Sequence, residues 1–382
     1  MFKKIGKTLT SQLFLYIVCF LNYKMFSDAS SVALSHNLHG TFISQKVNKI
    51  RWKPERFGES HFFIMGSVDN VINHITLWDL CENSDDEDIY PFPVTEQAYC
   101  GDVTELKFLN PDHFIATSSS GSAHLMKLKL PDVGDPLIEP VITWKDIHYF
   151  KNGDLSPCLS LAIYEQDLVT VGEDGRINVL TTQSSDVIRS IDADSCSIQC
   201  VIFVKHNEVL TSNLRGQMKI WDLRCGNNKA ASTFMLSSEP VMATCLTFHP
   251  NQRHIILAGD EMGALTTWDL RQNTLPVNIL NAHEGAITEI QFYYDNPDHL
   301  FSSSTTGEIW HWSTKNRNKF KPTFDLEETN VWLAPENVKS KIEVLTLMPT
   351  VGKSINCLDV NKNKVICGCD NEAIYLINGI NI

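Results

Sequence analysis

The sequence predicts an all-β fold, a seven-bladed β-propeller whose ring is closed by an N-terminal strand. The first observation is a repeat made of a β-rich run, a short turn rich in Gly, Asp or Asn, and a strand ending in a large apolar residue. The second is the spacing of 41–64 residues between these end residues, which fits four-stranded blades with inserted loops. The third is that no segment has the pattern of a long amphipathic helix. The seven end residues are Trp78, Met126, Leu180, Trp221, Trp268, Trp312 and Leu376.

Each end residue follows a second β-rich run at the distance that a hairpin requires. The clearest copies of the turn and its following strand are RGQMKIWDLR at 215–224, MGALTTWDLR at 262–271 and TGEIWHW at 306–312. The preceding runs include EVLTSN at 208–213 and HIILAGD at 254–260, which are apolar and end in small or polar residues. Small residues suit the inner part of a blade, where neighbouring sheets converge on the ring axis.

The two ends of the chain predict how the ring closes. After Leu376 only the residues INGINI remain, too few for a turn and a full outer strand. The missing strand must therefore come from before the first blade, and TFISQKV at 41–47 is a suitable β-rich segment. We expect it to pair as the outer strand of the seventh blade and to remove an open sheet edge. The propeller domain is therefore predicted to span 41–382.

Residues 1–40 form an N-terminal extension that is signal-like or non-native, and we expect it to be poorly ordered. Lys3, Lys4 and Lys7 precede the apolar run Leu13–Leu21, as in a secretory signal, and this run is too short to span a bilayer. The rest of the chain argues against secretion, because its 11 cysteines form no regular framework and no asparagine begins a glycosylation sequon. A start at Met25 would remove the apolar run.

Charge and motif content argue against several functions. The 45 acidic and 32 basic residues give a net charge of −13, which argues against direct binding to nucleic acid. Motifs for phosphate loops, metalloproteases and nucleophile elbows are absent, and no set of polar residues converging on the central channel can be identified. Cys367 and Cys369 suggest a metal site, but no second pair lies nearby in sequence, so strand packing explains them better. We therefore expect no enzyme, no metal and no cofactor.

The Trp-Asp pairs are predicted to be structural. A Trp at a strand end fills the gap between blades while its indole N–H seeks an acceptor. His283 stands where WD-repeat chains have a His that bonds a Ser or Thr of the next strand, here Ser302 or Ser303, together with the strand-end Trp312. The Asp usual in that network is missing, because Thr305 and Thr306 occupy the turn. The predicted structural residues are Trp78, Trp221, Asp222, Trp268, Asp269, His283, Ser302 and Trp312.

Three features are candidates for partner binding. Arg224 and Arg271 end two WDLR motifs in successive blades. Such pairs resemble those of the substrate receptors of cullin-RING ubiquitin ligases, which implies contact with the ligase adaptor; the alternative is that both form local ion pairs. Trp332 lies in the insertion at 313–340 and either contacts a partner or packs on its blade, because binding energy concentrates on Trp, Tyr and Arg. The acidic run at 82–88 is either a solvated loop or a site for a basic segment.

Several motifs in the same order resemble one family. They are SQKVNKIRWKP at 44–54, VGEDGRIN at 171–178, LRGQMKIWDLR at 214–224, HPNQRH at 249–254 and PDHLFSSSTTGEIWHW at 297–312. Together they look like the forty-three-kilodalton WD-repeat nucleoporins of the Y-shaped scaffold complex of the nuclear pore. The likeness covers essentially the whole propeller, whereas the family's members begin near the end of the N-terminal extension.

The resemblance implies a non-enzymatic scaffold subunit that binds an α-solenoid nucleoporin of the Y complex. It implies residence at the nuclear envelope, a part in pore assembly and in mRNA and protein transport, and a place at kinetochores in animals. We expect no direct nucleic-acid binding and no membrane insertion. The alternative, carried by Arg224 and Arg271, is a WD-repeat substrate receptor of a cullin-RING ubiquitin ligase.

Overall fold

The computed structural model describes residues 37–382 except 56–57, 83–88, 132, 227, 315–329 and 334–341. The predicted signal-like segment, almost all of the acidic run at 82–88 and most of the insertion at 313–340 therefore lie outside the described residues. The part of the chain that is described contains no helix of the length and hydrophobicity needed to cross a membrane.

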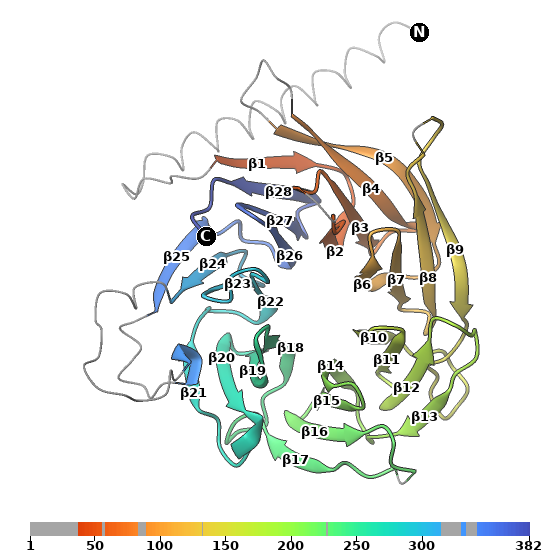
Figure 1. Cartoon of the computed structure of the whole chain (residues 1–382), viewed down its shortest axis with the longest axis vertical. Coiled ribbons are helices and arrows are strands. Elements are labelled where there is room, and N and C mark those ends of the chain that lie inside the picture. The colour runs from red at the N-terminus through yellow and green to blue at the C-terminus, as the bar shows by residue number, and fades with distance from the viewer. Residues whose placement is uncertain are drawn as a thin grey trace, which may run out of the picture. The chain divides into compact units, whose positions relative to one another are not determined.

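Seven four-stranded antiparallel sheets surround a central axis, which confirms the predicted propeller (Figure 1). Each sheet runs from an innermost to an outermost strand, and in the first six blades the four strands follow one another along the chain. From the inside outwards, the first four blades are β2(Lys46–Trp52), β3(Phe62–Val68), β4(Asn73–Glu82), β5(Ile89–Tyr99); β6(Val103–Asn110), β7(His113–Ser118), β8(Ala123–Lys129), β9(Leu137–Trp144); β10(Cys158–Tyr164), β11(Asp167–Gly172), β12(Arg176–Thr181), β13(Arg189–Asp192); and β14(Ile198–Lys205), β15(Glu208–Asn213), β16(Gln217–Asp222), β17(Ser232–Met235).

The remaining three blades complete the ring. They are β18(Ala243–His249), β19(Gln252–Asp260), β20(Ala264–Asp269), β21(Asn278–Asn281); β22(Ile287–Phe292), β23(His299–Ser304), β24(Ile309–Ser313), β25(Glu343–Met348); and β26(Ile355–Asn361), β27(Lys364–Cys369), β28(Ala373–Asn378), β1(Asn37–Phe42). Among the described residues, two single-turn 3₁₀ helices, η1(Leu270–Gln272) and η3(Val331–Leu333), lie in the connections. All seven predicted end residues fall on the third strand of a blade.

An N-terminal strand closes the ring as predicted, but its position was wrong. The outer strand of the seventh blade is β1, which spans Asn37–Phe42 and pairs with β28, whereas Lys46 and Val47 already belong to the innermost strand of the first blade. The propeller therefore begins before the predicted boundary at 41. The turn between β1 and β2 is fixed by a hydrogen bond of 2.8 Å from Ile43 N to Glu372 O in the seventh blade.

The core lies between neighbouring blades. Val47 of the first blade packs in one buried cluster with Ile366 and Leu376 of the seventh, so apolar contacts cross the closure. Small residues allow the sheets to approach closely near the axis. A Cβ built on Gly368 would lie 2.2 Å from Val47 Cγ1, and one on Gly66 would lie 2.4 Å from Val103 Cγ1 of the next blade. These glycines are therefore required by packing.

Candidate interaction site

The tryptophans at the strand ends are buried between blades. Trp221 Nε1 donates to Thr211 Oγ1 over 3.0 Å, on the adjacent strand of its own blade. Trp78 lies parallel to Phe63 with 6.1 Å between ring centroids, and the ring of Trp268 is 4.6 Å from that of Phe234. These contacts are with the protein's own core, so the geometry favours a packing role for the three rings.

The structure brings His283, Ser302 and Trp312 together in the sixth blade. His283 Nε2 lies 2.8 Å from Ser302 Oγ, and Trp312 Nε1 donates to the same oxygen over 2.9 Å. A carboxylate also lies near, because Glu308 Oε2 is 3.5 Å from His283 Nδ1. Sequence reasoning missed Glu308, which follows the turn instead of occupying it. Burial lowers the pKa of His283, although Glu308 opposes this effect.

A second network of this kind escaped the sequence analysis. His148 Nδ1 lies 3.0 Å from Asp174 Oδ1, and His148 Nε2 lies 2.9 Å from Thr170 Oγ1. The ring of His148 is fully buried in the third blade. The Asp-Gly turn at 174–175 was the available signal. His148 lies in the connection at 145–157, which is longer than the connections between the other blades, so the spacing in sequence does not link His148 to this turn.

Arg224 and Arg271 fold back on the Asp of their own motif. Arg224 donates from Nε to Asp222 Oδ1 over 2.9 Å and from Nη2 to Oδ2 over 2.8 Å. Arg271 makes the equivalent bonds to Asp269, at 3.0 and 2.7 Å. Hydrogen bonds from each Arg lower the pKa of its Asp. Both Arg side chains are nevertheless more than 60% exposed, so each guanidinium is held in a fixed position at the surface.

Trp332 is buried, so of the two alternatives for this residue the structure favours packing on a blade over contact with a partner. Its side chain is 2% exposed and meets Phe292 edge-on with 5.8 Å between centroids. Asn278 Nδ2 donates to Trp332 O over 3.0 Å, which fixes η3 against the fifth blade. An apolar residue in an insertion gives no signal in sequence that separates packing on a blade from contact with a partner.

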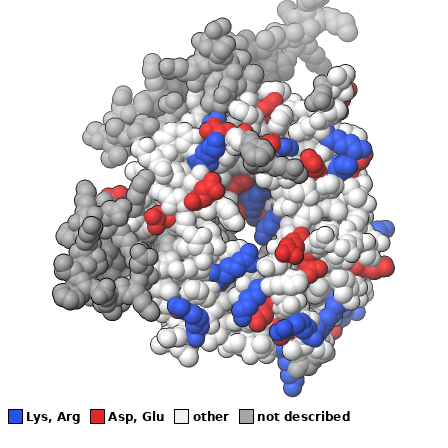
Figure 2. All heavy atoms as spheres, viewed as in Figure 1, with Lys and Arg blue, Asp and Glu red and all other residues white. Residues whose placement is uncertain are grey.

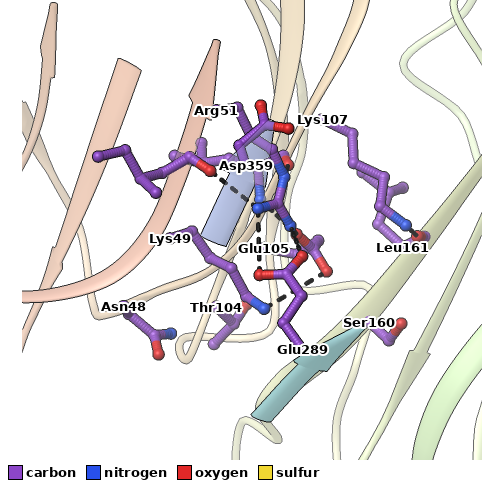
Figure 3. Close-up of polar contacts among 12 residues, drawn as sticks. Asn48, Lys49, Arg51, Thr104, Glu105, Lys107, Ser160, Leu161, Glu289 and Asp359 are labelled. Atoms are coloured by element: carbon purple, nitrogen blue, oxygen red, sulfur yellow. Dashed lines mark hydrogen bonds and ion pairs between the residues drawn. The ribbon is translucent and has the colours of Figure 1, made fainter. Parts of the chain in front are cut away.

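A set of charged residues does converge on the central channel, contrary to the sequence interpretation. In Figure 2 both basic and acidic atoms are visible inside the central opening. Arg51 of β2 is the centre of this channel cluster (Figure 3): its Nη2 lies 2.6 Å from Glu289 Oε1 of β22 and 3.1 Å from Glu105 Oε1 of β6. Arg51 also donates to the carbonyl oxygens of Leu106 and Leu358. One side chain thus joins the first, second, sixth and seventh blades.

The other charges of the channel cluster are also compensated. Lys49 Nζ is 3.8 Å from Glu105 Oε2, and Lys107 Nζ donates to Leu161 O over 2.6 Å (Figure 3). Asp359 accepts from Gln291 Nε2 over 2.6 Å. Burial by itself would raise the pKa of Glu105, but Lys49, Lys107 and Arg51 lower it. Burial raises the pKa of Asp359 despite Arg51 nearby. The charged side chains of the channel cluster therefore have ion-pair or hydrogen-bond partners within the protein itself.

Six polar residues and one leucine occupy equivalent positions on the seven innermost strands. Each innermost strand has a register shift at the same place, and the residues there are Asn48, Thr104, Leu159, Gln199, Thr244, Thr288 and Asn356. Several reach the backbone of the next blade: Asn48 Nδ2 donates to Val103 O over 2.7 Å, and Asn356 Nδ2 to Val47 O over 2.9 Å. Most of these residues line a cavity of about 320 Å³.

The cysteines and the remaining acidic and histidine residues offer no metal site within the described part of the chain. No group of three or more His, Cys, Asp or Glu there is arranged to hold a metal ion. Cys367 and Cys369 are fully buried in β27, and burial raises the pKa of both thiols, so neither is activated as a thiolate.

The fold and these networks define a WD-repeat type of β-propeller with a self-compensated channel. The chain is 33% identical to the nucleoporin Nup43 of Homo sapiens over 374 residues, covering 89% of this chain and 98% of that protein. It is 32% identical to Nup43 of Mus musculus with the same coverage. It is 27% identical to the nuclear pore complex protein nup43 of Dictyostelium discoideum, covering 56% of this chain and 51% of that protein. No protein-family model matches.

The chain therefore belongs to the Nup43 family of nucleoporins. This confirms the family that the ordered sequence motifs predicted, together with the nuclear pore complex at the nuclear envelope as its location.

Proposed function

We propose that this protein is a non-enzymatic scaffold subunit of the Y complex of the nuclear pore and that it binds an α-solenoid nucleoporin. The observation that carries the proposal is the likeness to Nup43 over 89% of this chain and 98% of that protein. A closed ring with charged and polar bonds between blades suits a scaffold, because a rigid surface loses little conformational entropy on binding. Pore assembly, transport of mRNA and protein, and kinetochore attachment in animals follow from the same proposal.

The channel cluster supports a role without catalysis. A catalytic acid, base or nucleophile needs access to substrate and a pKa matched to its task. Glu105 and Glu289 are instead bound to Arg51, and their side chains are 10% and 15% exposed. A substrate would have to displace Arg51 before it reached either carboxylate.

The test is affinity purification and imaging of the tagged full chain. We expect Y-complex nucleoporins, an α-solenoid subunit among them, to be recovered with a signal at the nuclear rim. A matched chain that begins at residue 37 retains β1 and should behave in the same way, whereas one that begins at 44 lacks the closing strand and should not. Recovery of no nucleoporin by the full chain would refute the scaffold proposal.

The second candidate function, a substrate receptor of a cullin-RING ubiquitin ligase, is favoured by the fixed, exposed guanidinium groups of Arg224 and Arg271. Replacing both with Ala should abolish recovery of the ligase adaptor and leave the nuclear-rim signal intact. Recovery of the adaptor by this variant, or its absence with the unaltered chain, would exclude the candidate.

A further inference from the structure

An exposed apolar strip crosses the ends of the fourth and fifth blades. It consists of Leu214, Val241, Met242 and Met262, and we call it the methionine strip. Leu214 lies in the turn between β15 and β16, and Met262 lies in the turn between β19 and β20; their side chains are 51% and 69% exposed. Val241 and Met242 are partly exposed and belong to the connection from β17 to β18, which joins the two blades.

Hydrogen bonds and a close backbone approach hold the two turns of the strip against the connection between them. Met242 N donates to Glu261 Oε1 over 2.9 Å, and Glu261 N donates to Met242 O over 3.1 Å. These two bonds join the connection to the turn that carries Met262. On the other side, a Cβ built on Gly216 would lie 2.2 Å from Val241 O, so the turn after Leu214 touches the same connection. Apolar side chains of two blades are thereby presented on one supported surface.

The surroundings of the strip are mainly acidic. Glu239 and Glu261 lie in the connection and in the turn that form the strip, and both are exposed. Glu284 follows His283, whose backbone N donates to Gly263 O over 2.9 Å beside Met262, and Glu284 is exposed too. The basic residue in the same turns is Arg215, next to Leu214.

We propose that the methionine strip is the docking surface for a basic amphipathic helix of a partner protein. Methionine side chains are flexible and polarizable, so they adapt to the apolar face of a helix. Lys and Arg on the flanks of that helix would meet Glu239, Glu261 and Glu284, which matches charge across the interface. The same carboxylates repel nucleic-acid phosphates and anionic lipid headgroups. The helical form of the partner rests on the proposed function, whereas its basic and apolar character follows from the strip.

The probe for this surface is a fluorescein-labelled amphipathic peptide of Leu and Lys, about 18 residues long, which is about five helical turns. Its anisotropy is titrated with the full chain. We expect Leu214→Ser with Met262→Ser to weaken binding by about tenfold, a difference well above titration error. The matched control, Leu275→Ser with Tyr294→Ser, changes two apolar residues that are 73% and 80% exposed, in connections at the other ends of the strands, and should bind within about twofold of the unaltered chain.

Two further titrations decide what the strip recognises. A peptide of the same composition with scrambled apolar spacing should bind weakly, and so should a Leu and Glu peptide with helical spacing. Equal binding of the strip and control variants, equal binding of the scrambled peptide, or no binding of the Leu and Lys peptide would each overturn the proposal.

Purification of the tagged full chain separates failure of this inference from failure of the proposed function. If the unaltered chain and the strip variant recover nucleoporins equally, the strip is not their docking surface and the proposed function stands. If the unaltered chain recovers none, the proposed function fails, and the peptide titrations alone decide whether the strip binds a basic helix.

Discussion

Replacing Arg51 with Met should destabilise the propeller strongly, because Arg51 holds the two carboxylates of the channel cluster. The guanidinium contacts Glu289 at 2.6 Å and Glu105 at 3.1 Å, and these three side chains are 10–15% exposed. Removing one partner of a buried ion pair leaves an uncompensated charge, which costs about 3–5 kcal/mol. The carbonyls of Leu106 and Leu358 lose a donor as well. We therefore expect the free energy of unfolding to fall by about 4 kcal/mol.

Urea unfolding, followed by tryptophan fluorescence and by circular dichroism, measures this loss as a lower midpoint. The control is Lys46→Met, on the same strand as Arg51, which removes a surface ion pair of 2.9 Å with Asp69 and should leave the midpoint almost unchanged. Adding Glu105→Gln and Glu289→Gln to Arg51→Met should recover part of the loss, because the buried charges are then removed. If Arg51→Met shifts the midpoint no more than Lys46→Met does, the channel cluster does not stabilise the ring.

Three other changes test the packing and the pH dependence. Gly368→Ala should lower the free energy of unfolding in urea by about 2 kcal/mol, because the added Cβ would meet Val47 Cγ1 at 2.2 Å. The control is Gly226→Ala, where the added Cβ meets nothing within 4 Å. Gly352 also lies in open space, but its φ of +66° makes it unsuitable as a control. Trp332→Ala should cost about 3 kcal/mol, because the ring is 2% exposed, and an unchanged midpoint would contradict its burial. Burial lowers the pKa of His283 in the folded protein, so the unfolded chain binds more protons once the pH falls through the ordinary histidine pKa of about 6.5. The urea midpoint should therefore fall as the pH is lowered from 7.5 through about 6.5. The fall should be smaller in His283→Gln.

The number of blades and the position of each third strand could be predicted because their signals are local. A turn Gly with positive φ, such as Gly216 or Gly263, precedes a strand whose apolar end residue fills the space between blades. The closing strand was misplaced for the opposite reason. The chain turns between β1 and β2 at Ser44, whose φ is +58°. A serine gives no indication in sequence that the backbone adopts this conformation. In sequence, the β-rich run therefore continues through the turn without a break.

The channel cluster could not be predicted, because its members meet only after the ring has closed. Arg51 and Glu289 are separated by 238 residues, and they lie on the innermost strands of the first and sixth blades, with the seventh blade between them. In sequence each is a charged residue in an otherwise apolar strand, which also describes many half-buried surface positions. Only the convergence of the innermost strands on one axis turns these separate charges into a network.

The same convergence bears on where a partner can bind. Arg51 reaches across the channel to the sixth blade, and Asn48 and Asn356 donate to the backbone of the next blade on either side of the closure. Polar groups bound in this way are satisfied without a ligand, so a partner that entered the channel would have to break these bonds before it gained new ones. Residues at the strand ends face no such cost: Leu214 and Met262 are apolar and exposed, and covering them releases water without unpairing any buried group. The free energy of binding therefore favours contact of a partner with the turns and connections of the blades, while the polar bonds around the channel hold the blades together.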